Sequence, residues 1–80
     1  MHFDYQDRRY HLTRASDLKR DGLGLELHAD DRHVAEVFYW DATGEFTISV
    51  FQLDVPLAVI QQLITAAEAT LPPATKIHGL

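Results

Sequence analysis

The densest set of potential metal ligands in this sequence lies at residues 28–33, which read His-Ala-Asp-Asp-Arg-His. In a tight hairpin, His28 and His33 would face each other across two strands, with the two aspartates at the tip. Two imidazoles and a carboxylate can bind zinc or another divalent metal, so the candidate ligands are His28, Asp30 and His33. Asp is also an ordinary turn residue, and the spacing matches no established metal motif. A plain hairpin turn is the favoured interpretation, and no metal or other cofactor is predicted.

A single carboxylate, Glu36, is the second place where the sequence could support chemistry, because it interrupts an apolar run from Val34 to Phe38. A carboxyl group enclosed by apolar side chains in a cleft is a common general acid or base. Such a residue also needs a partner, and His11 or His28 could approach it only through the fold. The alternative, which we favour, is a glutamate that faces solvent because the register differs by one residue. Glu36 is thus the one catalytic candidate, and the sequence favours a protein that is not an enzyme.

Five of the seven basic residues gather between positions 8 and 20, where the only carboxylate is Asp17, in a chain whose net charge is −5. A basic segment of this kind could contact the phosphates of a nucleic acid or another anion. The alternative is that these side chains lie across the acidic remainder of the chain or are simply solvated. We favour the alternative, so nucleic acid is not the expected partner. The candidate anion-binding residues are Arg8, Arg9, Arg14, Lys19 and Arg20.

Other chemistries are excluded by composition or by incomplete motifs. The sequence has no cysteine, which excludes disulfides, thiolate metal sites and a cysteine nucleophile. Gly22 and Gly24 lack the third glycine and the following helix of a dinucleotide-binding loop. Gly24 instead indicates a bulge or a close backbone approach within a strand.

Hydrophobic periodicity predicts the elements that must position these residues. Leucines alternate with glycine or polar residues from Leu23 to Leu27, and a β-branched and aromatic run follows, as is typical of strands. Further along, the apolar spacing becomes that of a helix, with Asp54 as its cap and Pro56 in its first turn. The predicted strands lie at about 9–13, 22–29, 34–41 and 45–53, and the predicted helix lies at about 55–71.

These elements define an α+β fold, a three- to four-stranded antiparallel β-meander with one C-terminal amphipathic helix packed on one face. Residues 1–80 form a single domain, because a chain of this length supports one core at most. The segments expected to be flexible are 1–8 and 74–80.

The turns decide which side chains share a face of the predicted sheet. A two-residue turn at 30–31 would pair Leu27 with Val34, and a three-residue loop at 42–44 would pair Trp40 with Phe46. Phe38 and Trp40 would then pack beneath the helix. The opposite face would carry an apolar strip, which is the predicted interaction surface: Val37, Tyr39 and Phe51.

One helix covers only one face of a sheet, so this strip needs another cover. Three alternatives stay open: the N-terminal segment with Tyr5, Tyr10 and Leu12, a second copy of the chain, or a ligand or protein partner. An 80-residue chain without disulfides would gain stability from self-association. We therefore predict a small non-catalytic protein-interaction domain whose partner is another protein or a second copy in a homodimer.

A resemblance rests on three segments, Arg20–Leu27, Val34–Phe38 and Asp54–Leu57. Over about residues 20–72, the chain resembles small uncharacterised bacterial proteins of about this length. The resemblance implies a bacterial origin and carries no activity with it. The sequence shows neither a signal peptide nor an apolar run long enough to span a membrane. The expected location is therefore cytoplasmic, with no membrane partner.

Overall fold

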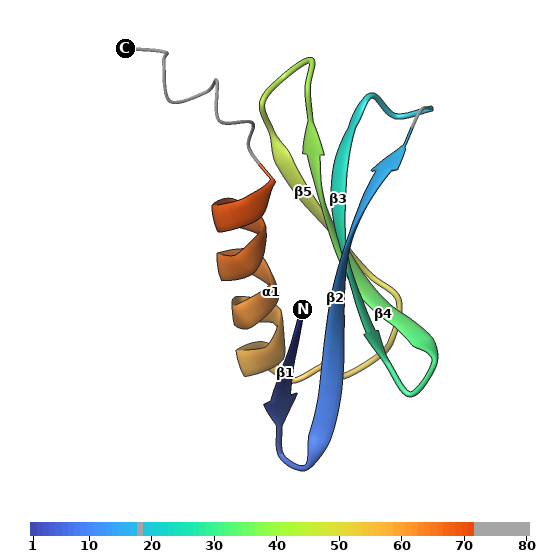
Figure 1. Cartoon of the computed structure of the whole chain (residues 1–80), viewed down its shortest axis with the longest axis vertical. Coiled ribbons are helices and arrows are strands. Elements are labelled where there is room, and N and C mark those ends of the chain that lie inside the picture. Colours follow the sequence, from blue (N-terminus) through green and yellow to red (C-terminus); the bar gives the residue numbers. More distant parts are fainter. Residues whose placement is uncertain (18, 72–80) are drawn as a thin grey trace.

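The strands of this protein form a continuous antiparallel meander, shown in Figure 1 by a computed structural model that describes residues 1–17 and 19–71. Five strands follow one another in chain order, and one helix crosses one face of the sheet. The predicted α+β fold is confirmed, with five strands in place of three to four. The elements are β1 (His2–Tyr5), β2 (Arg8–Asp17), β3 (Gly22–Ala29), β4 (Arg32–Trp40), β5 (Phe46–Val50) and α1 (Leu57–Thr70).

The added strand is β1, which lies in the segment 1–8 that we predicted to be flexible. It pairs with β2 in a register that sets Phe3 opposite Tyr10. Gln6 and Asp7 form the turn between the two strands, with φ angles of 48° and 63°. These left-handed angles are typical of a two-residue hairpin turn, and the usual sequence signal for such a turn is Asn-Gly or Asp-Gly. Because Gln-Asp carries no such signature, the sequence did not reveal this hairpin.

The turn between β3 and β4 is the predicted two-residue turn. Asp30 and Asp31 have φ angles of 51° and 61°, and Ala29 pairs with Arg32 on either side of them. Aspartate tolerates the left-handed region better than most residues, which suits this turn.

A β-bulge follows this turn and changes the register of β4. His28 lies opposite His33, as a regular hairpin requires. Leu27, however, lies opposite Ala35, which leaves Val34 as an extra residue on β4. An extra residue reverses the face to which every later side chain of the strand points. The predicted faces of β4 are therefore wrong beyond residue 34.

The connection between β4 and β5 also differs from its prediction, both in length and in the register that it sets. It takes in residues 41–45 rather than the predicted loop 42–44, and Tyr39 rather than Trp40 lies opposite Phe46. As a result, the side chains of β5 that point to the helix side lie opposite the residues of β4 that the bulge has turned toward the helix.

These two register changes bury residues that we predicted to lie on the surface. Val37 and Tyr39 are 4% and 2% exposed, in the core cluster beneath α1. The predicted interaction surface is therefore wrong, and Phe51 is its one exposed member at 53%. The helix contributes Val59, Leu63 and Ala67 to this core, and its C-cap residue Leu71 is buried there as well.

The N-terminal residues and the helix start complete the covered side of the sheet. Tyr10 and Leu12 are buried in the same core and Tyr5 packs against it, so this segment does not cover the opposite face. Asp54 makes no cap hydrogen bond, and Pro56 holds the N-cap position instead. Among the described residues, no helix has the length and apolar character needed to span a membrane. The segment 74–80, predicted to be flexible, lies outside the described residues.

Candidate functional site

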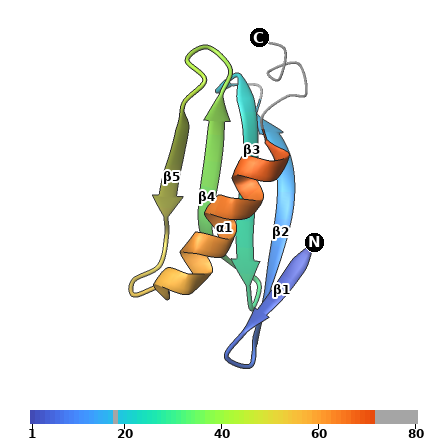
Figure 2. The ribbon, with the colours of Figure 1, turned by 90° about the vertical axis from the view of Figure 1, so that its left-hand side faces the viewer.

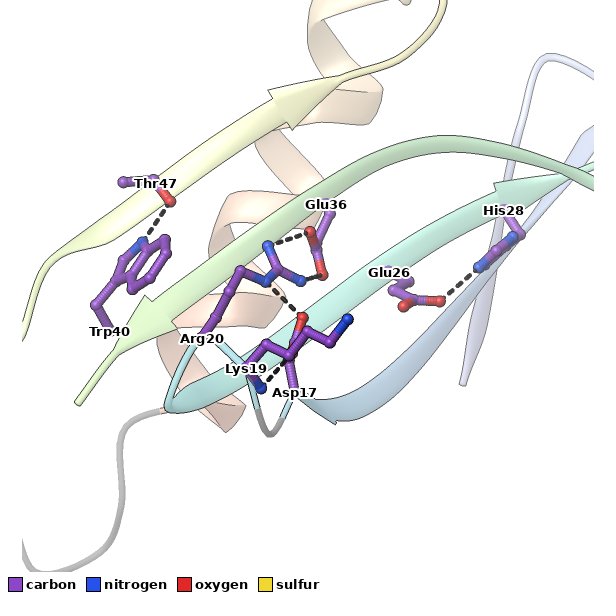
Figure 3. A network of polar contacts seen from close by, with 8 residues as sticks. All are labelled: Asp17, Lys19, Arg20, Glu26, His28, Glu36, Trp40 and Thr47. Carbon is purple, nitrogen blue, oxygen red and sulfur yellow. Dashed lines mark hydrogen bonds and ion pairs between the residues drawn. The ribbon is translucent and has the colours of Figure 1, made fainter.

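The face of the sheet away from the helix carries a hydrogen-bonded network centred on Arg20 (Figure 3). Arg20 lies in the turn between β2 and β3, and its guanidinium extends over the sheet. The two terminal nitrogens donate to Glu36, at 3.2 Å to Oε1 and 3.0 Å to Oε2. The Nε donates to Asp17 Oδ2 at 2.6 Å. One guanidinium therefore joins the end of β2 to the middle of β4.

Two glycines of β3 leave the room that this network occupies. A Cβ atom at Gly24 would lie 2.6 Å from Glu36 Oε2, and one at Gly22 would lie 2.7 Å from the Phe38 ring. The Arg20 guanidinium lies over the same Phe38 ring, with Cζ 4.0 Å from the centroid, in a cation–π contact. Gly24 thus marks a close approach within a strand, and the groups that approach it are side chains of β4.

Glu36, the catalytic candidate, is part of this network, with its side chain 8% exposed. Both carboxylate oxygens accept hydrogen bonds from Arg20, the bidentate pairing of a strong ion pair. These bonds, followed by those to Asp17, raise the pKa of Arg20. His28 is not the partner of Glu36, because its Nε2 lies 3.0 Å from Glu26 Oε1. The geometry gives Glu36 the role of holding the β2–β3 turn on the sheet.

The ion pair between Asp17 and Arg20 makes stability sensitive to acid. The hydrogen bond from Arg20 is the main cause that lowers the pKa of Asp17 below its ordinary value of 3.8. A group with a lowered folded-state pKa stabilises the fold above its ordinary pKa, and this effect is lost as pH falls through the folded value. In urea unfolding, the wild type should exceed Asp17→Asn in stability at about pH 6, and the difference should shrink toward about pH 3. An unchanged difference across this range would contradict the prediction.

The basic residues proposed for anion binding are separated and largely neutralised by the fold. Arg8 pairs with Asp30 at 2.9 Å, and Arg9 pairs with Asp4 at 2.9 Å. Neighbouring residues of a strand point to opposite faces, so Arg8 and Arg9 do not share a surface. Among the residues that the structure describes, the candidates outside any ion pair are Arg14 and Lys19.

Four histidines form a row across β1 to β4 on the polar face. The cross-strand pairs are His2 with His11, His11 with His28, and His28 with His33. The His28 and His33 rings stack with centroids 4.5 Å apart. Their nearest carboxylate is Glu26 rather than the predicted Asp30, which pairs elsewhere. The sequence did contain a signal for Glu26, because residues two apart on a strand share a face.

The helix covers only part of its own face, and β5 lies outside the cover (Figure 2). The helix packs on β3 and β4. The helix-side residues Phe46, Ile48 and Val50 are therefore 39%, 44% and 48% exposed. A groove of about 170 Å³ lies between Phe46 and Ile48 of this strand and Ile64 of α1. The alternation of apolar residues predicts a buried face for β5, and the position of the strand beside a single short helix is what leaves this face open.

Comparison with known proteins identifies no family for this chain. No protein-family model matches the chain, and no curated protein or solved structure gives a significant match. The residues of the two faces and of the β5 edge are therefore the basis for any assignment of function.

Proposed function

We propose that this chain is a protein-interaction domain that forms a homodimer through the outer edge of β5. The observation that carries the proposal is an edge strand, Phe-Thr-Ile-Ser-Val, with no charge and three partly exposed apolar side chains. Edge strands that avoid pairing are usually protected by lysine, proline, inward charges or a bulge. Among the described residues, β5 carries none of these devices, so its outer backbone groups can pair with another strand.

The sequence of β5 is complementary to itself in an antiparallel pair. A two-fold axis through Ile48 would set Ile48 against its own copy and Phe46 against Val50 of the second copy. On the opposite face, the hydroxyl of Thr47 would lie across from that of Ser49. A two-fold interface uses the same patch on both subunits, and this strand meets that requirement with apolar pairs on one face and hydroxyl pairs on the other.

The surface beside β5 extends the apolar contact area. The N-terminus of α1 and the preceding loop lie near one end of β5 (Figure 2), where Leu53 and Leu57 are 92% and 71% exposed. Ile64 faces the groove from the middle of the helix. Stable interfaces bury about 1,200–2,000 Å² in total, or about 600–1,000 Å² per copy. A five-residue strand with these flanking side chains provides an area near the lower limit of this range.

The test is a charge on the edge strand. Ile48→Lys should give a folded monomer, because Ile48 is half exposed and a lysine on each copy would meet its equivalent at the two-fold axis. Sedimentation equilibrium over a concentration series should show dimerisation of the wild type and none, or at least tenfold weaker association, for the variant. Circular dichroism should show that both are folded.

Thr13→Lys is the matched control, because it adds the same charge to an exposed position of β2 far from β5 in the strand order. It should dimerise like the wild type. A wild-type mass that stays monomeric at several hundred micromolar, or an Ile48→Lys variant that dimerises as well as the control, would overturn the proposal.

A further inference from the structure

The row of histidines ends in a cluster that the β5 interface does not use. Three donor groups, those of Glu26, His28 and His33, have ligand atoms that all lie within 4.8 Å of one another. Two of these, Glu26 Oε1 and His28 Nε2, are already 3.0 Å apart. With bond lengths of about 2.0–2.2 Å, the ligands of a tetrahedral zinc ion lie about 3.3 Å from each other. Closing the cluster onto an ion therefore needs shifts of the order of 1 Å, together with rotation of the stacked rings.

The imidazole of His33 supplies the second observation. Its Nε2 is buried and has no hydrogen-bond partner among the described residues. A buried polar nitrogen without a partner is uncommon, because it loses its hydrogen bond to water and no hydrogen bond within the protein replaces it. The ring is held from two sides, by His28 and by Phe51, whose centroid lies 4.6 Å away. A metal ion bound through Nε2 would provide the interaction that this nitrogen lacks.

The charges around Glu26 favour a cation at the same place. Glu26 lies directly opposite Glu36 on β4, and like charges in this position destabilise a sheet. Arg20 neutralises Glu36 through both of its oxygens. Glu26 contacts His28 and has no arginine or lysine partner among the described residues. A divalent ion bound at Glu26 would balance the charge of this second carboxylate.

We propose that Glu26, His28 and His33 bind a divalent transition-metal ion of the zinc class. Two imidazoles and one carboxylate are a donor set that zinc accepts, and water or the neighbouring His11 could take a fourth position. The three ligands lie on two paired strands, which hold them in place. The ion would join β3 to β4 beside their turn and would add to a fold that forms without it.

The binding test uses the full chain without a purification tag and zinc chloride as the probe. Isothermal titration should show one zinc ion per chain, and excess zinc should raise the Tm by mass action. Glu26→Gln and His33→Ala should each weaken zinc binding at least tenfold while the circular dichroism spectrum stays that of a folded protein. In NMR spectra, zinc should shift the ring signals of His28 and His33 more than those of His2.

His2→Ala is the matched control, because His2 belongs to the same row but lies outside the three-ligand cluster. It should bind zinc like the wild type, and so should Ile48→Lys if the site lies within one chain. No binding at about 100 µM zinc, an equal loss of affinity in His2→Ala and His33→Ala, or a loss in Ile48→Lys would overturn the proposal. The last outcome would instead indicate a metal bridge between two chains.

Discussion

Replacing Tyr39 with Asp is expected to unfold the protein. Tyr39 is 2% exposed beneath α1, where it lies between Leu23 of β3 and Phe46 of β5. The substitution removes a large buried ring and places a carboxylate in an apolar core, which together cost more than about 4 kcal/mol. A domain of this length has a total stability of only about 4–12 kcal/mol. Circular dichroism at 25 °C should show loss of the sheet signal, and the thermal transition should be strongly lowered or absent.

Ile48→Asp is the comparison that makes this result informative. Ile48 lies on the same face of the neighbouring strand but is 44% exposed, so its carboxylate can reach water and the fold should persist. A Tyr39→Asp variant that remained folded, as Ile48→Asp should, would show that β4 presents its other face to the helix. This pair of variants therefore tests the bulge at Val34 directly.

Replacing Arg20 with Ala should destabilise the fold by about 2–4 kcal/mol, because the Glu36 carboxylate would be left without its partner in a site with little access to water. We expect a loss in the lower part of the range that is usual for breaking a buried ion pair, since the Arg20 side chain is itself 36% exposed. The variant also loses the cation–π contact with Phe38. Urea unfolding should report the change as a lower transition midpoint at unchanged slope.

Two further variants separate the ion pair from a general effect of removing a charge. Arg20→Ala combined with Glu36→Gln should recover a large part of the lost stability, because no charge is then left unpaired. Arg9→Ala should change the midpoint little, because Arg9 and Asp4 are both well exposed and surface ion pairs contribute little. Equal losses in Arg9→Ala and Arg20→Ala would show that the network on the polar face is not what holds the turn.

Much of the fold was predictable from local features of the sequence. The alternation around Leu25, the two-residue turn at Asp30 and Asp31, and the helical spacing after Pro56 each act within a few neighbouring residues. The strand at 22–29 was predicted with the bounds that the structure has, and the helix to within about two residues at either end. These features are readable because their causes are close together in the chain.

The faces of β4 were decided only by the tertiary structure. From Val34 to Tyr39 this strand is buried on both sides, so its apolar residues show no contrast that could fix which face meets the helix. The bulge at Val34 reverses that choice, and a bulge is a property of the pairing of two strands. The same reversal moved Tyr39 into the core and Glu36 onto the polar face.

The candidate sites depend on contacts between residues that are distant in sequence. Arg20 meets Glu36 across 16 positions, and His11 becomes a neighbour of His28 only when β2 pairs with β3. The sequence supplied the residue types, including the two histidines that flank the β3–β4 turn. Which carboxylate joins them, and which apolar strand is left open at the sheet edge, follow from strand register and from the area that one short helix can cover.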